Sequence, residues 1–136
     1  MLALAPVNPA HAAVVKCSRT DVISTWEGSC DRTPDDDDPG GVSGFATLQY
    51  GKNPGYSATV QFIARDEIMW ATNHMSEKVY FELQWWDDSG KIHRVLHSLE
   101  PGENHSWNQN IREGRKVAIF VSHLRIGTVA MVNLKA

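Results

Sequence analysis

The sequence predicts an all-β protein, an antiparallel β-sandwich of about seven to nine short strands preceded by an N-terminal arm. From Phe45 onward, apolar and polar residues alternate with a period of two, as in half-buried strands. Clusters of Gly, Pro, Asn and Asp interrupt this pattern at intervals of roughly eight to twelve residues. No strand pattern is followed by a long helical pattern, so a parallel α/β fold is not expected.

Each predicted strand ends at a turn signal. The strands expected after the arm are FATLQY (45–50), YSATVQFIAR (56–65), EIMWAT (67–72), VYFELQWW (79–86), KIHRVLHSL (91–99), 105–111, VAIFVSHLRI (117–126) and TVAMVNL (128–134). The turns between them include Gly51–Gly55, Asp87–Gly90 and Pro101–Glu103. In residues 79–86 the alternation places Val79, Phe81, Leu83 and Trp85 on one face and Tyr80, Glu82, Gln84 and Trp86 on the other.

The first forty residues differ from the rest of the chain, and they divide it into three parts. Residues 1–12 are apolar and end in Ala10-His11-Ala12, a pattern that signal peptidase cleaves, so we interpret them as the remnant of a signal peptide. Residues 13–41 form an arm that closes with the acidic, polar stretch 31–41, interpreted as a charged, extended spacer. Residues 42–136 are the predicted sandwich domain.

Cys17 and Cys30 are the only cysteines, and both lie in the arm. An even cysteine count in a secreted chain favours a disulfide, which would stabilise the fold by about 3 kcal/mol. A zinc site is not expected, because no further Cys or His pair stands near them at ligand spacing. The sequence therefore predicts a secreted, extracellular protein with one Cys17–Cys30 disulfide.

The composition does not point to nucleic acid or membrane as a partner. The net charge is −3 and 42% of the residues are apolar, typical of one folded domain. No stretch approaches the ~20 apolar residues of a membrane-spanning helix. The aspartate run 35–38 lacks the spacing of a calcium loop, and like charges extend such a segment.

The sequence carries no catalytic motif, so we expect no enzyme activity, cofactor or metal. His93 and His97 spell H-R-V-L-H, but Arg94 stands where a zinc protease needs glutamate. On a strand these two histidines would also lie ~13 Å apart. There is no G-x-S-x-G elbow and no glycine-rich phosphate loop.

Two groups of residues are candidates for binding. Alternation places Trp86 outside the core with Tyr80 and Gln84, the composition of a sugar-binding face or a protein interface, and Trp107 has the same ambiguity. These side chains would instead be covered if a loop or the arm packed over this face. The second group lies in the arm and consists of Ala13, Val14, Val15, Val22, Ile23 and Trp26. The arm is either an edge hairpin of its own sheet or a segment that inserts into a partner by strand addition.

Three segments carry a family resemblance: residues 60–67 (VQFIARDE), 80–90 and 111–121. With them the chain resembles small secreted actinobacterial proteins, some of which are the adaptor subunit of umbrella toxin particles. In that family a small β-sandwich links a lectin-bearing subunit to a large stalked toxin polypeptide, and its N-terminal extension inserts into the lectin-bearing subunit. The resemblance implies a secreted, non-enzymatic adaptor in antibacterial competition, with these two proteins as partners. The alternative is a small carbohydrate-binding module.

Overall fold

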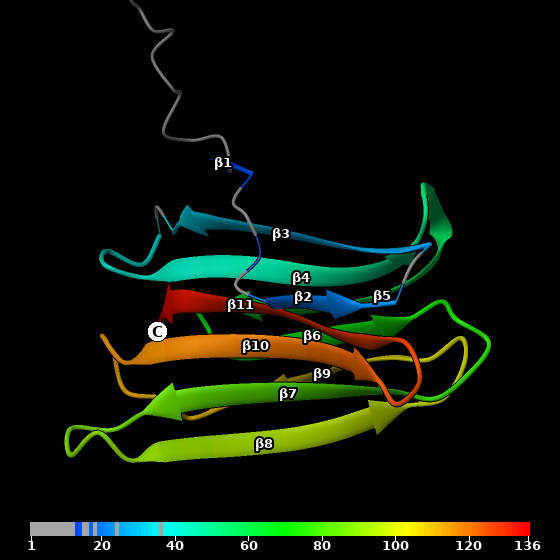
Figure 1. Ribbon diagram of the computed structural model, residues 1–136. Helices are drawn as coiled ribbons and strands as arrows, with labels where there is room; N and C mark the ends of the chain where they lie inside the picture. The colour runs from blue at the N-terminus through cyan, green and yellow to red at the C-terminus, as the bar shows by residue number, and fades with distance from the viewer. Residues whose placement is uncertain (1–12, 15–16, 18, 24, 36) are drawn as a thin grey trace, which may run out of the picture.

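The computed structural model describes residues 13–14, 17, 19–23, 25–35 and 37–136, and it confirms the all-β, antiparallel class (Figure 1). The strands are β1 Ala13–Val14, β2 Arg19–Val22, β3 Trp26–Pro34, β4 Val42–Tyr50, β5 Asn53–Ile63, β6 Ile68–Asn73, β7 Val79–Trp86, β8 Ile92–Leu99, β9 Asn104–Asn108, β10 Lys116–His123 and β11 Gly127–Lys135. Among the described residues, none belongs to a helix that could cross a membrane.

The strands form one continuous sheet that folds back on itself. The main order is β8-β7-β10-β11-β4-β5-β6-β9, with β3 paired to β4, β2 to β11 and β1 to β3. In Figure 1, β11, β10, β7 and β8 form a front layer, and β5, β6 and β9 lie behind it. Because β8 and β9 end the strand order and lie near each other, the two layers enclose the core as a flattened, barrel-like sandwich.

The predicted alternation correctly identifies much of the core. Val79, Phe81 and Leu83 are completely buried on β7, as are Val60 and Phe62 on β5. Side chains at every second position reach the space between the layers, where removing apolar surface from water stabilises the fold by about 25 cal/mol per Å².

The end of β10 differs from the predicted strand 117–126. The strand stops at His123, and Nδ1 of His123 accepts hydrogen bonds from the backbone N–H of Arg125 at 3.1 Å and Ile126 at 3.3 Å. This side chain therefore closes a turn that ends at Gly127, where β11 begins. The hairpin contains no conventional turn pair before Gly127, which is why the pattern of apolar residues extended the predicted strand too far.

The acidic stretch 31–41 is also more structured than predicted. Residues 31–34 belong to β3 and pair with β4 from Phe45 to Val42. After them, the backbone N–H of Asp35 donates to the carbonyl of Gly41, and Asp37 forms an ion pair with Arg65 at 2.8 Å. The described part of this stretch is thus a β-turn region held to the sheet, because its aspartates find backbone and arginine donors.

Candidate functional site

The predicted disulfide between Cys17 and Cys30 is present, and Cys30 is buried in the core. It joins the start of the arm to the middle of β3. A disulfide in a chain of this size is compatible with an oxidising, extracellular environment. Within the described residues there is no free cysteine.

Some of the predicted arm residues pack on the protein's own sheet, and others remain exposed. Val22 pairs with Gly127 of β11 and packs against the core, and Trp26 lies against Tyr50 at a ring distance of 5.2 Å. Ile23 remains 49% exposed. The backbones of Ala13 and Val14 pair with Arg32 and Asp31 of β3, while Val15 lies outside the described residues.

The structure therefore places β2 and Trp26 on their own domain, but the described parts of segments 14–17 and 22–26, the two strands of the expected edge hairpin, do not pair with each other. β2 and β3 do not pair with each other: β2 extends the edge of β11, and β3 extends the edge of β4. A single-residue register pair, Lys135 with Val42, joins β11 to β4, so the rest of that edge is open to β2. This arrangement requires contacts far apart in sequence, which local patterning does not encode.

The predicted face of β7 is formed, but the Gln84 amide on it already has a partner. Tyr80, Gln84 and Trp86 are each half-buried on this strand. The Gln84 amide donates to the Glu82 carboxylate at 2.6 Å, and the ammonium of Lys116 lies 5.7 Å from the centre of the Trp86 ring. Trp86 is thus a half-buried aromatic surface next to a cation, and Gln84 has one fewer donor for a ligand.

Trp107 does not join this face. It lies on β9, where its ring stacks on that of His97 from β8 at 3.9 Å and on that of His105 at 4.7 Å. Burial and the neighbouring His105 charge lower the pKa of His97. In the sequence His97 was considered only together with His93, as a strand residue; in the structure it joins two strands that are not paired with each other.

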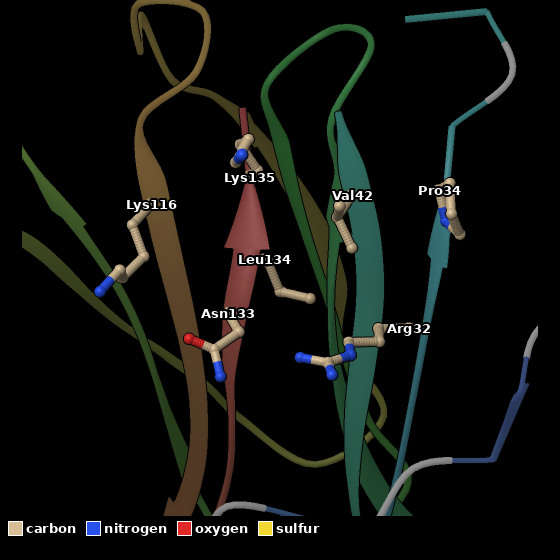
Figure 2. A pocket seen from close by; sticks show the side chains of 7 residues that line it. All are labelled: Arg32, Pro34, Val42, Lys116, Asn133, Leu134 and Lys135. Carbon is tan, nitrogen blue, oxygen red and sulfur yellow. The ribbon is translucent and has the colours of Figure 1, made fainter. Parts of the chain in front are cut away.

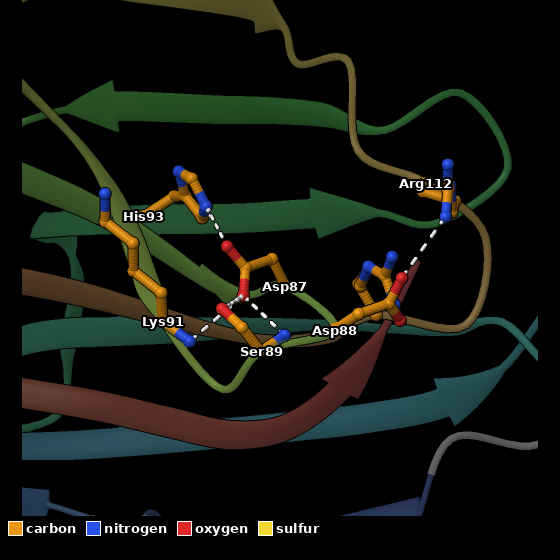
Figure 3. Close-up of polar contacts among 7 residues, drawn as sticks. Asp87, Asp88, Ser89, Lys91, His93 and Arg112 are labelled. Atoms are coloured by element: carbon orange, nitrogen blue, oxygen red, sulfur yellow. Dashed lines mark hydrogen bonds and ion pairs between the residues drawn. The ribbon is translucent and has the colours of Figure 1, made fainter.

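Asp87 organises the turn between β7 and β8, as Figure 3 shows. Its Oδ1 accepts hydrogen bonds from the backbone N–H of Ser89 and Lys91 and from the Ser89 hydroxyl, and its Oδ2 lies 2.8 Å from Nε2 of His93. The Ser89 hydroxyl and then His93 hold the pKa of the Asp87 carboxyl far below its usual range. Ser89 contacts the carboxylate and not the imidazole, so this group lacks the serine–histidine contact of a hydrolase triad.

Three basic side chains line a cleft that was not predicted from the sequence (Figure 2). We call it the basic cleft. It has a volume of about 610 Å³, and its lining includes Arg32 from β3, Val42 from β4, Lys116 from β10, and Asn133, Leu134 and Lys135 from β11. Lys116 and Lys135 are direct register partners, whereas 116 and 135 are distant in sequence. The only sign of this cleft in the sequence was a lysine at the start of one strand and another lysine at the end of the next strand.

No group of three or more His, Cys, Asp or Glu side chains in the described part of the chain is arranged to hold a metal ion. Comparison of the chain with protein-family models, curated proteins and solved structures gives no match.

Proposed function

We propose that this chain is a secreted, non-enzymatic adaptor that joins subunits of an extracellular protein particle. The observation that carries the proposal is that β1 and β8 lie at opposite ends of the molecule (Figure 1). Each of them pairs with a single neighbouring strand among the described residues, β1 with β3 and β8 with β7. Two separate strand edges suit a small protein that must contact two partners at once.

The first edge is the arm. Strand addition supplies affinity through main-chain hydrogen bonds, and it needs an exposed strand edge and no preformed pocket. β1 is held by a two-residue ladder just ahead of the disulfide, so Ala13–Val15 can be presented to a partner while Cys17 anchors them. Because Val22 and Trp26 pack on their own domain, the proposed contact narrows to residues 13–15. The exposed Ile23 lies at the opposite end of β3, where its carbonyl accepts a hydrogen bond from the backbone N–H of Trp26. The proposed partner is a lectin-bearing subunit.

The second edge is β8, whose outward side chains include two exposed apolar residues. Ile92 is 41% exposed and Leu96 is 63% exposed. Apolar side chains gathered on an edge strand favour association with another protein. The proposed partner there is the large stalked toxin polypeptide.

Co-purification of these two partners from culture supernatant tests the proposal, with the tagged, full-length secreted protein as bait. Removing residues 13–15 should abolish recovery of the lectin-bearing subunit and keep the stalked polypeptide, whereas Leu96→Asp should do the reverse. Leu124→Asp is the matched control, because Leu124 is 89% exposed in the β10–β11 turn. Recovery of neither partner by the unaltered protein, or equal loss with the Leu124 variant, would reject the adaptor proposal.

The alternative, a carbohydrate-binding module, is supported by the half-buried Trp86 with Gln84 next to it on the same side of β7, and Tyr80 farther along that side. An aromatic ring flanked by polar groups is suited to stacking on a sugar. Trp86→Ala should then abolish retention on a glycan column while the unfolding temperature stays close to that of the parent protein. Unchanged retention would exclude this face.

A further inference from the structure

The basic cleft concentrates positive charge without a carboxylate to balance it. Lys116 and Lys135 occupy directly opposed positions of β10 and β11, and like charges at such positions of a sheet are destabilising. Arg32 adds a third cation from β3. Among the described residues, no ion pair forms at any of these three side chains, in a protein whose net charge is −3.

Basic side chains elsewhere on the described surface mostly have acidic partners. Those in ion pairs with carboxylates are Arg65, Lys78, Arg94, Arg112, Arg115 and Arg125. Among the described residues Lys52 and Lys91 also form no ion pair, so the three cations of the cleft differ in their grouping: they line one cleft and none of them is paired with a carboxylate. Repulsion among unpaired cations destabilises the folded state. Such a grouping in a cleft is expected where a ligand supplies the missing negative charge.

We propose that the basic cleft binds an anionic saccharide unit, one that carries a carboxylate or a sulfate. This inference extends the carbohydrate alternative to a different site and substrate class, and it is independent of the adaptor proposal. Arg32, Lys116 and Lys135 would contact the anionic group, for which arginine offers paired donors and lysine a point charge.

The backbone around the cleft favours a compact ligand over an acidic peptide strand. At this level Lys116 pairs with Lys135, Lys135 with Val42, and Val42 with Pro34. These positions of β10, β11, β4 and β3 are thus already joined side by side, so a peptide strand cannot add between them at this level. Recognition must therefore come from side chains.

The lining fits a sugar ring in both size and chemistry. Val42 and Leu134 supply apolar surface, and Asn133 supplies an amide that can donate and accept hydrogen bonds. In Figure 2, Arg32 extends toward Leu134 and Asn133 of β11. At one edge, the Lys116 ammonium lies 5.7 Å from the Trp86 ring, so an aromatic surface adjoins the cations. A volume of about 610 Å³ is in the range of small-ligand sites.

Asn133 has a backbone conformation that supports this assignment. Its φ is 65°, in the left-handed region that few residues other than glycine adopt. It lies beside the register shift between β10 and β11, where an additional residue of β11 is accommodated. Such bulges redirect side chains near functional sites, and here the bulge brings an amide to the lining of the cleft.

Isothermal titration calorimetry of the full chain at low salt tests the proposal with four probes. These are a heparin-derived tetrasaccharide, tetragalacturonate, the neutral cellotetraose, and a hexaglutamate peptide. We expect binding of one or both acidic saccharides, and tetragalacturonate and the heparin fragment distinguish a carboxylate from a sulfate ligand. Affinity should fall as salt rises, because the contacts are ionic. Lys116→Gln and Lys135→Gln should each weaken binding about tenfold.

Two control variants keep this test decisive. Lys52→Gln removes an exposed lysine from the β4–β5 turn, at the opposite end of β4 from Val42, and should leave affinity unchanged. Lys135→Arg keeps the charge and should retain binding. The proposal is overturned if no acidic saccharide binds, if cellotetraose or hexaglutamate binds equally well, or if the Lys52 variant loses as much affinity as the cleft variants. Since the glutamine variants remove like-charge repulsion, their unfolding temperatures should not fall, and lower binding then reports the lost contact.

Discussion

The imidazole of His97 on β8 lies parallel to the indole of Trp107 on β9, with the ring centres 3.9 Å apart and the planes inclined by 5°. These two strands are the opposite ends of the strand order and do not pair through their backbones. His105 stacks on Trp107 at 4.7 Å. The sandwich is therefore closed along this side by stacked side chains where a complete barrel would have a hydrogen-bonded ladder.

Replacing Trp107 should loosen this closure. Trp107→Ala removes two ring contacts and part of the apolar cover of the core, so we expect the free energy of unfolding to fall by about 2 to 3 kcal/mol. Trp70→Ala is the matched control, because Trp70 is 43% exposed on β6 and should cost less than about 1 kcal/mol. Urea unfolding measures both, and equal effects would show that the stack does not hold the edges together.

The same stack predicts a loss of stability in mild acid. Burial and then the charge of His105 lower the pKa of His97, so the unfolded chain takes up its proton at higher pH than the folded chain does. The stability that comes from neutral His97 is complete above the unfolded histidine pKa of ~6.5. It is lost as the pH falls through the pKa of His97 in the folded protein. His97→Phe should preserve stacking and flatten this part of the profile. An unchanged profile in urea titrations between pH 8 and 5 would contradict the assignment.

The sequence predicted those parts of the fold that depend on neighbouring residues and missed those that depend on distant contacts. The period-two pattern located β7 at residues 79–86, because alternation across a half-buried strand is written into consecutive residues. The arm was predicted less well. Whether the arm segments 14–17 and 22–26 form a hairpin with each other or join other strands depends on contacts with residues as distant as Gly127.

The candidate sites were harder to predict for the same reason. Tyr80, Gln84 and Trp86 share a strand, so alternation was sufficient to group them. The basic cleft combines Arg32 with Lys116 and Lys135, and no spacing in the sequence relates them. His97 and Trp107 belong to different strand edges, and only the closure of the sheet brings them into contact.

Removing a negative charge near Asp38 should stabilise the protein at neutral pH. A hydrogen bond with Asp38, followed by burial and the Asp38 charge, raises the pKa of Glu113. Burial and then the charge of Glu113 raise the pKa of Glu67. Carboxyls with raised pKa values favour folding at low pH and lose that benefit as pH rises through the folded value. Glu113→Gln should therefore raise the unfolding temperature at pH 7 and have less effect at pH 4.

Calorimetric melts at both pH values check this prediction. Glu27→Gln is the control, because Glu27 is an exposed carboxylate near the start of β3, whereas Asp38 follows the end of this strand. A gain with Glu27→Gln as large as that with Glu113→Gln would attribute the effect to net charge alone.

Gly28 is required for the arm to pack on the front layer. A Cβ at this position of β3 would lie 2.3 Å from Cγ2 of Thr20 on β2 and 2.8 Å from Cγ2 of Val129 on β11. Both distances are too short for carbon atoms, so Gly28→Ala must displace β2 from the edge of β11 or shift β3. We expect a loss of about 1 to 3 kcal/mol in the free energy of unfolding. Amide hydrogen exchange should show faster exchange in residues 19–22 while β7 stays protected, whereas unchanged protection of β2 would show that the arm does not depend on this close approach.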